Sequence, residues 1–250
     1  MQYKKGNRCT FQIVYANMSE KEVTTMFNGK MKAVTFSLDD GVHQDIRVIE
    51  LLNKYNLKAT FNLNSDRLGV ESYCVKKEDV KYIYAGHEVA GHTLTHPYLP
   101  HIEDDKEVIR QVEQDRLNLS ELVGYEVVGM AYPGGYENTN DRVVKLIQEN
   151  TGIKYARVWK TTTSFELQTD LLRYRGTSDI CNDPHLMELT EAFLASKAET
   201  PQIFYINGHA YHLDQEPGRW ERLEEFFQMI SGHPDVFYGT NKEILLRKKL

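Results

Sequence analysis

Hydrophobic and polar positions along the chain follow two different periods. Short apolar runs rich in β-branched and aromatic residues predict strands, and longer segments with apolar residues three or four apart predict helices. The clearest helix is predicted from Asp104 to Val123, where the apolar residues share one face and Gly124 ends the pattern. A second helical period runs from Ile46 to Tyr55, and Asp45 is predicted as its N-cap.

Predicted strands and helices alternate along the chain. Strands are expected in CTFQIVYA, KAVTFSL, KATFNLN, the end of VKYIYAGHEVAGH, YEVVGMAYP, KYARVW, QIFYING and VFYGT. Further helices are expected at the start of VKYIYAGHEVAGH, in NDRVVKLIQENTG, near Leu186–Lys197, from Trp220 to Ile230 and in NKEILLRKK. Such alternation is typical of parallel strands joined by crossover helices. It predicts an α/β fold in which βα units close or nearly close a barrel.

Length and composition narrow the picture further. The 250 residues suit one large α/β domain or two small ones, and the absence of a linker favours one. We expect a short N-terminal β extension over residues 1–30 and one domain over residues 31–250, which the resemblance described below makes the catalytic domain. The net charge of −6 offers no basic footprint, so no nucleic-acid partner is expected. The three cysteines are too few and too widely spaced for a disulfide framework.

The sequence also bears on location. No apolar stretch approaches the roughly 18 residues of a membrane-spanning helix, and the first residues contain no apolar signal-peptide core. We therefore expect no membrane span. The protein is expected to be cytoplasmic as the sequence is written, or secreted or at the cell surface if a targeting segment has been removed. The sequence makes no prediction about oligomeric state.

Candidate chemistry begins in TFSLDDG, where Asp39 and Asp40 stand side by side at a strand end. Adjacent like charges repel, so the pair fits either a solvated turn or a site that holds a cation. His92 and His96, in HTLTH, are predicted to lie on one side of a helical turn, although such pairs also arise by chance. Two imidazoles and one carboxylate form a three-ligand site for a catalytic divalent metal, and the other aspartate could accept a proton from water.

Two later motifs add candidate groups. His209, in INGHAY, could be a general acid or an ordinary structural histidine. In YPGGY, Pro133 and two glycines could bring the backbone close to a ligand, so that an N–H near Gly134 stabilises an oxyanion, or they could form an ordinary turn. Four aromatic residues could stack on sugar rings or belong to the core: Tyr132, Tyr136, Trp159 and Tyr211.

Taken in order, TFSLDDG, GHEVAGHTLTH, YPGGY and INGHAY resemble the motifs of the polysaccharide deacetylase family, which has the NodB homology domain and is carbohydrate esterase family 4. The resemblance extends from Met31 to Lys249 and includes IELLNKYNLKATFNLN between the motifs. It implies a distorted (β/α)7-type barrel with parallel strands. It also implies a metal-dependent hydrolase that removes acetyl groups from carbohydrate.

The resemblance assigns roles to matching positions. Asp39 matches the catalytic base, and His209 matches the general acid. Asp40, His92 and His96 match the metal ligands, most often for zinc, with cobalt, nickel and manganese as alternatives.

Two supporting residues of the family pattern are missing. Ala131 occupies the place of an arginine that steadies the base, and Arg157 in YARVW is the candidate substitute. The aspartate of the family's fourth motif has no clear match, although Asp170 and Asp183 are candidates. The expected substrate is therefore an acetylated carbohydrate, with N-acetyl sugars preferred and an O-acetyl esterase as an alternative. A sugar-binding relative without turnover is a second alternative, and a metal-free amidase of small nitrogenous compounds ranks last.

Overall fold

A computed structural model of the 250-residue chain describes residues 26–246. The predicted N-terminal β extension, including the strand expected in CTFQIVYA, lies almost wholly outside these residues. The end of the helix predicted in NKEILLRKK lies outside them as well.

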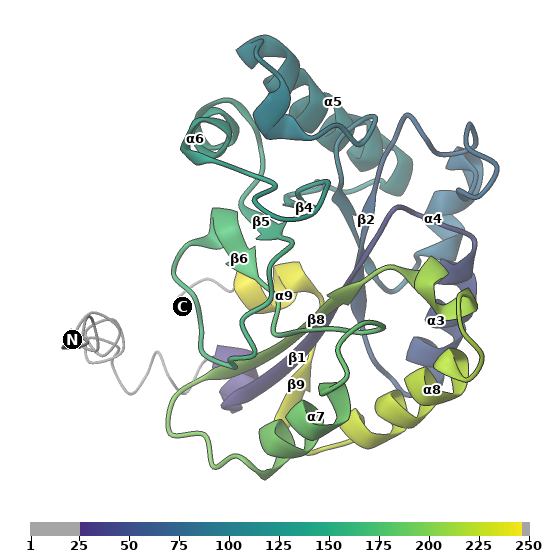
Figure 1. Ribbon diagram of the computed structural model, residues 1–250, viewed down its shortest axis with the longest axis vertical. Coiled ribbons are helices and arrows are strands. Elements are labelled where there is room, and N and C mark those ends of the chain that lie inside the picture. Colours follow the sequence, from purple (N-terminus) through teal and green to yellow (C-terminus); the bar gives the residue numbers. More distant parts are fainter. Residues whose placement is uncertain (1–25, 247–250) are drawn as a thin grey trace, which may run out of the picture.

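A single curved sheet of parallel strands forms the centre of the fold (Figure 1). The strands follow the order β6-β5-β4-β3-β2-β1-β8-β7, and β9 pairs with the first residues of β1 on the edge opposite β8. All the pairs are parallel. The strands are β1 (Lys32–Asp39), β2 (Ala59–Leu63), β3 (Glu88–Gly91), β4 (Gly129–Ala131), β5 (Tyr155–Val158), β6 (Tyr174–Arg175), β7 (Ser178–Asp179), β8 (Gln202–Gly208) and β9 (Val236–Tyr238). The predicted α/β fold, a distorted barrel with parallel strands, is confirmed.

Helices cover much of the outside of this sheet, with α5 and α6 at one end of the view and α7 and α8 at the other (Figure 1). The helices are α3 (Gln44–Lys54), α4 (Val80–Ile83), α5 (Asp105–Val123), α6 (Asp141–Asn150), α7 (Leu186–Ala195), α8 (Arg219–Ile230) and α9 (Asn241–Leu245). Within residues 26–246, no helix combines the length and the apolar character that crossing a membrane requires.

The central strand β1 is buried on both faces, but its two faces differ in chemistry. Side chains of a strand point alternately to opposite faces. Phe36 belongs to the main apolar core and meets Phe226 and Phe227 of α8 edge to face, with ring centroids 6.0 and 5.2 Å apart. Ser37 and Asp39 alternate with these apolar positions. The strand therefore carries a carboxylate to its end on the face turned away from α8.

The sequence predicted the caps of α5 correctly and the N-cap of α3 incorrectly. Asp104 caps α5 by accepting a hydrogen bond from the Lys106 N–H, and Gly124 ends it with a left-handed φ of 76°. In α3 the N-cap position is His43, so the prediction that Asp45 caps this helix is wrong. Asp45 lies within the first turn, fully buried, and accepts a 2.8 Å hydrogen bond from the Tyr84 hydroxyl. The short strands β6 and β7 were not predicted.

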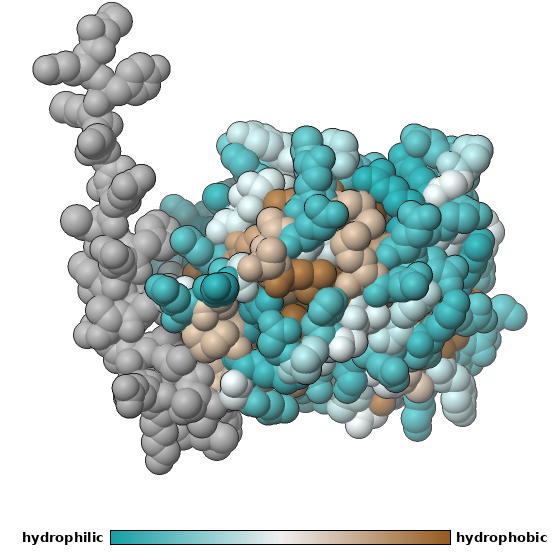
Figure 2. Space-filling view, turned by 90° about the horizontal axis from the view of Figure 1, so that it is seen from below, coloured by the Kyte–Doolittle hydropathy of each residue, from teal (hydrophilic) through white to brown (hydrophobic). Residues whose placement is uncertain are grey.

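The view from below shows a mixed surface (Figure 2). Apolar residues gather near the centre of this face, and hydrophilic residues surround them. The candidate chemistry lies at the carboxyl ends of β1, β3 and β8, as expected for a barrel of this kind.

Candidate metal centre and active site

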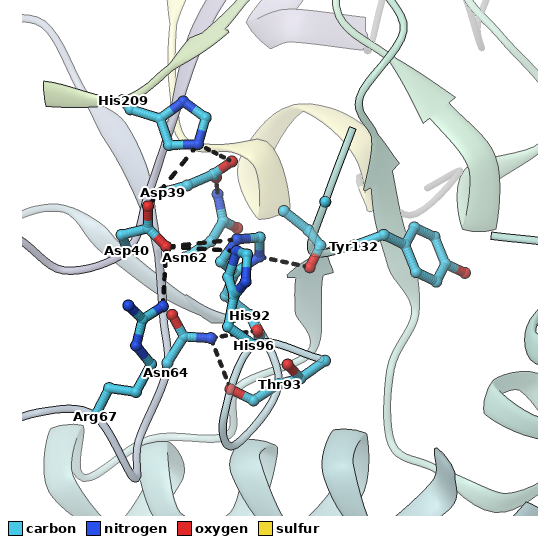
Figure 3. A network of polar contacts seen from close by, with 12 residues as sticks. Asp39, Asp40, Asn62, Asn64, Arg67, His92, Thr93, His96, Tyr132 and His209 are labelled. Carbon is cyan, nitrogen blue, oxygen red and sulfur yellow. Dashed lines mark hydrogen bonds and ion pairs between the residues drawn. The ribbon is translucent and has the colours of Figure 1, made fainter. Parts of the chain in front are cut away.

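Asp40, His92 and His96 converge on one point, although β2 separates the strands that precede them (Figure 3). One ligand atom from each residue lies within 4.8 Å of the others. Asp40 Oδ1 is 3.9 Å from His92 Nε2 and 3.7 Å from His96 Nε2. One carboxylate and two imidazoles form a donor set that suits a catalytic divalent metal.

The turn after β1 separates the two adjacent aspartates. Asp40 and Gly41 both adopt left-handed backbone conformations, with φ of 82° and 67°. A side chain at Gly41 would place its Cβ 2.9 Å from Leu63 Cδ2, so the turn requires glycine for space as well as for conformation. The Asp40 N–H donates to the Asn62 carbonyl at 3.0 Å, which ties the turn to the end of β2.

The segment from His92 to His96 is a loop, so the predicted helical turn is wrong. Thr93 and His96 have positive φ values of 68° and 63°, which no helix accommodates. Asn64 Nδ2 donates to the carbonyls of His92 and Thr93. The buried Asp115 on α5 accepts the His92 N–H at 3.0 Å. Tertiary hydrogen bonds, and not a helical repeat, therefore bring the two imidazoles together.

The histidines present lone pairs to the site. His92 Nδ1 lies 2.8 Å from the Ala131 carbonyl, which can only accept, so Nδ1 carries the proton and Nε2 is free to bind a cation. Burial, together with the neighbouring His92, lowers the pKa of His96 to about 4, so this ring is neutral at pH 7.

The Asp40 carboxylate also fits a cation. Its Oδ1 is buried and has no hydrogen-bond partner within residues 26–246. The nearest cation, Arg67 Nη1, is 3.7 Å away and too far for a hydrogen bond, so the lone pairs of this oxygen are still available to a closer cation. The residues present therefore fit a divalent metal ion, and the Asp40, His92 and His96 side chains would hold it.

Asp39 has a different environment from its neighbour. It is buried, forms an ion pair with Arg157 Nη2 and accepts a 2.8 Å hydrogen bond from Asn62 Nδ2. Burial acts to raise the pKa of Asp39, but Arg157, His92 and His209 outweigh it and lower this pKa to about 2. Asp39 is therefore ionised over the whole physiological range.

The guanidinium beside Asp39 comes from a different strand than the family pattern predicts. Ala131 on β4 and Arg157 on β5 are partners in the parallel register of these two strands. Side chains of paired positions on neighbouring parallel strands point to the same face of the sheet. An arginine one strand further away can therefore reach the same carboxylate, and Arg157 is where the sequence placed the candidate substitute.

His209 follows β8 and faces both aspartates. Its Nε2 is 3.8 Å from Asp39 Oδ2 and 3.9 Å from Asp40 Oδ2. Its buried Nδ1 has no hydrogen-bond partner within the described residues. The candidates for the fourth-motif aspartate are engaged elsewhere, since Asp170 pairs with Arg173 and Asp183 accepts from Ser178 Oγ.

Sequence reasoning missed several residues around the site. Asn62, Asn64 and Asp115 hold the loops, as described above, and Asp179 on β7 lines a cavity beside His209. Asn62 and Asn64 could have been recognised from the sequence, because they are polar residues in the apolar strand pattern KATFNLN and buried polar side chains require hydrogen-bond partners. Asp115 looked like an ordinary polar position of an amphipathic helix.

The first residues of the YPGGY segment are buried in the core, and its glycines line the cavity at the site. The Tyr132 ring is buried and points away from the histidines in Figure 3, and its hydroxyl donates to the Leu172 carbonyl at 3.0 Å. Of the two alternatives for this ring, the structure favours the core, and its N–H is also occupied, donating to the Arg157 carbonyl. Pro133 is buried as well. Gly134, with a φ of 86°, lines the cavity at the site.

The cavity at the site has a volume of about 240 Å³. It is smaller than pockets that enclose a whole drug-sized ligand, so it would admit only part of a larger substrate. Trp159 and His209 also line a neighbouring cavity of about 470 Å³. Tyr211 lies at the first cavity, and the exposed Tyr136 packs edge to face on Trp159, with ring centroids 6.5 Å apart. The lining is given by Asp39, Asp40, His92, His96, Tyr132, Gly134, Gly135, Arg157, Trp159, His209 and Tyr211.

Comparison with known proteins identifies the family of this chain. The sequence profile of the family described as polysaccharide deacetylase matches residues 27–156, slightly more than half of the chain. The chain belongs to the polysaccharide deacetylase family.

Relatives of known description extend the comparison. A peptidoglycan-N-acetylglucosamine deacetylase from Bacillus cereus is 33% identical over 127 residues, which are 49% of this chain and 54% of that protein. The chain thus aligns with about half the length of this curated relative. A probable polysaccharide deacetylase from Pseudomonas aeruginosa has a similar structure, with a TM-score of 0.70, 15% identity, and coverage of 93% of this chain and 95% of that one.

The same fold carries other activities. The Puue allantoinase has a TM-score of 0.69 with 14% identity, and the match covers 98% of this chain and 96% of that one. At this level of identity the likeness shows the fold alone. The activity must therefore be argued from the site.

Proposed function

We propose that this protein is a metal-dependent hydrolase that removes acetyl groups from carbohydrate, acting on N-acetyl sugars. The observation that carries the proposal is the division of labour between Asp39 and Asp40 at one cavity. Asp39 forms a close ion pair with Arg157, whereas Asp40 Oδ1 lies 3.7 Å from the nearest guanidinium, has no hydrogen-bond donor and stands beside two imidazole nitrogens. One carboxylate is thus arranged to accept a proton, and the other is arranged to bind a cation.

The metal would be held by Asp40, His92 and His96, and zinc is the preferred ion. When bound, a divalent ion supplies a Lewis acid that polarises a carbonyl and makes water more acidic. Cobalt, nickel and manganese remain alternatives, because the same donor set accepts them.

Asp39 is proposed as the general base. Arg157 holds it ionised, so it is available to take a proton from the attacking water. The same guanidinium makes Asp39 a weaker base, because it stabilises the carboxylate more than the acid. Arg157 is thus proposed to set the balance between the ionised fraction of Asp39 and its strength as a base.

His209 is proposed as the general acid. Its Nε2 faces the cavity beside both carboxylates, so a protonated ring could hand its proton to the departing amine of an N-acetyl sugar. The Gly134 N–H is proposed as an oxyanion donor. Trp159, Tyr136 and Tyr211 are proposed to contact the sugar rings.

Peptidoglycan is the proposed first substrate to test, because the Bacillus cereus relative is described as a peptidoglycan-N-acetylglucosamine deacetylase. An O-acetyl ester would need the same site with an alcohol as leaving group, so acetylxylan belongs in the same experiment. The missing arginine at Ala131 was the reason to consider a sugar-binding relative without turnover. Arg157 now supplies a guanidinium to Asp39 and weakens that reason.

The decisive experiment measures acetate release from peptidoglycan, chitooligosaccharides and acetylxylan, with and without a chelator. Wild type should release acetate from at least one of them, lose this activity with the chelator and regain it with added zinc. Asp39→Asn should be nearly inactive. Release that is indifferent to the chelator, or full activity of Asp39→Asn, would contradict the proposal. Tight oligosaccharide binding without acetate release would favour the sugar-binding alternative.

A further inference from the structure

A further cavity lies at the carboxyl ends of β5 and β6, which are neighbours in the sheet (Figure 1), and the proposed reaction does not use it. Its volume is about 440 Å³, within the range of cavities that bind small molecules. The loop after β4 and the segment between β5 and β6 form its walls. Because all the strands are parallel, this cavity opens on the same rim of the barrel as the candidate metal centre.

A pair of exposed aromatic rings joins the two cavities. Trp159 lines the cavity at the metal ligands, and Tyr136 lines the cavity at β5 and β6. The two rings meet edge to face, with centroids 6.5 Å apart. Both rings are proposed above to contact sugars. A glycan chain that crosses this pair would therefore reach both cavities at once.

Positive charge is in excess around the cavity at β5 and β6. Three cations and two carboxylates line it. Arg173 is already paired with Asp170, with nitrogen and oxygen 3.2 Å apart. Lys160 and Arg175 have no ion-pair partner among residues 26–246, and against these two cations stands the single carboxylate of Glu137. The cavity is therefore suited to an anionic group.

Side-chain hydrogen bonds fix the backbone of the cavity walls. Gln168 Oε1 accepts the Arg175 N–H at 3.0 Å, and Gln168 Nε2 donates to the Arg175 carbonyl at 2.8 Å. Asn138 Nδ2 donates to the Tyr132 carbonyl at 2.7 Å, and its Oδ1 accepts the Trp159 N–H at 3.3 Å. These contacts tie the three wall segments to the ends of their strands. Less chain has to be ordered when a ligand binds to such a site.

We propose that this cavity binds a carboxylate carried by the substrate polymer, next to the sugar that loses its acetyl group. The inference rests on the proposed function for the identity of the polymer. The Arg175 guanidinium is shaped to hold a carboxylate, and Lys160, 5.8 Å from the centroid of the Tyr136 ring, adds a second charge beside the aromatic pair. Peptidoglycan strands carry carboxylates on their stem peptides, and on the lactyl groups once the peptides are removed, whereas chitooligosaccharides carry none. The cavity would thus select acidic glycans over neutral ones.

The test compares three soluble glycans of similar length. The first is peptidoglycan strands with their stem peptides, and the second is the same strands after an amidase has removed the peptides and left the lactyl carboxylates. The third is chitooligosaccharide. The affinity of the zinc-loaded protein for each is measured by isothermal titration calorimetry, with Asp39→Asn as the background so that turnover does not interfere. Acetate release by the protein with Asp39 intact gives kcat and KM separately.

The protein should bind one or both acidic glycans about tenfold more tightly than chitooligosaccharide. Arg175→Gln should raise Kd and KM for the acidic glycans about tenfold, since a hydrogen bond between charged groups is lost, and should leave kcat and the affinity for chitooligosaccharide unchanged. Arg175→Lys keeps the charge and should retain part of the preference. Lys81→Gln, at an exposed position of α4, is the control and should match wild type. A preference that survives the amidase identifies the lactyl carboxylate as the ligand, and one that disappears identifies the peptide carboxylates.

Equal affinity for acidic and neutral glycans would overturn the inference, and so would a loss in Arg175→Gln that is the same for all three glycans. If Arg175→Gln does not fold, Lys160→Gln decides, and it should weaken binding of the acidic glycans alone, by about threefold. Unchanged binding in that variant contradicts the inference. A preference that Arg175→Gln removes, in a protein that releases no acetate from any glycan, would support the carboxylate site and contradict only the proposed function. Acetate release without any preference would contradict only the inference.

Discussion

Asp39 and Asp40 are neighbours in the chain, but they lie in two different environments. Asp39 is the last residue of β1, buried beside Arg157 and Asn62, with its charge already compensated. Asp40 begins a left-handed turn and faces two histidines with Oδ1, which has no hydrogen-bond donor within residues 26–246 and lies 3.7 Å from Arg67 Nη1. Under the proposed function, the same functional group thus serves as a base in one place and as a metal ligand in the next. The surrounding hydrogen bonds, and not the residue type, decide between these properties.

Removal of either carboxylate is expected to have the largest effect and to separate the two roles. Asp39→Asn should lower acetate release by roughly 10²–10⁴-fold, as loss of a general base does, and should leave zinc affinity nearly unchanged. Asp40→Asn should weaken zinc binding and abolish release together. Chelator competition and an acetate assay measure the two quantities. Asp79→Asn, at an exposed position, is the control. An equal loss of zinc binding in both variants would contradict the division of roles.

Loss of Arg157 should affect the Asp39 side alone. Arg157→Met leaves a buried carboxylate without its partner and should lower the free energy of unfolding by about 3–5 kcal/mol at pH 7. In wild type the pKa of Asp39 is about 2, against an ordinary 3.8. Its ionised form therefore contributes stability above pH 3.8, and this contribution is lost as the pH falls through 2. The stability difference between the two proteins should shrink over this interval in urea unfolding at a series of pH values.

A rescue variant sharpens the same point. Ala131 and Arg157 are register partners, so Ala131→Arg combined with Arg157→Ala returns a guanidinium to the same face of the sheet from β4. The double variant should release acetate faster than Arg157→Ala alone. Equal rates would show that the guanidinium must come from β5.

Asp115→Asn should affect the Asp40 side alone. It replaces one of the two oxygens that accept the backbone N–H groups of Ser65 and His92, so the histidine loop loses support. Zinc affinity should fall about 10- to 100-fold, as for other residues that orient metal ligands. Gln114→Ala, on the exposed face of the same helix, is the control, and its zinc affinity should equal that of wild type.

The smallest effects are expected at the rim. Trp159→Ala should raise KM for oligosaccharides about three- to tenfold, because an aromatic contact is lost, and should leave kcat nearly unchanged. Tyr132→Phe loses one hydrogen bond in the core, so its unfolding free energy should fall by about 1 kcal/mol while KM stays the same. A raised KM in Tyr132→Phe would return this ring to the substrate site.

Local sequence signals predicted an element correctly where all the residues that determine it lie within that element. The amphipathic period of α5, its cap at Asp104 and its stop at Gly124 are all encoded within about twenty residues. The strands β6 and β7 were missed because two residues cannot display an alternating pattern, and their pairing depends on β5 and β8. The cap at Asp45 was misjudged because Tyr84, on a distant segment, recruits that carboxylate.

The amino-acid sequence was sufficient to predict the alternation of strands and helices, the positions of Asp39, Asp40 and His209 at strand ends, and the spacing of His92 and His96. These follow from periodicity and from motifs within short segments. Only the tertiary structure decided that the histidine loop is bent and that Arg157 replaces the arginine missing at Ala131. It also turned the Tyr132 ring into the core. Each of these outcomes depends on contacts between segments that are far apart in the chain, and a linear pattern does not record them.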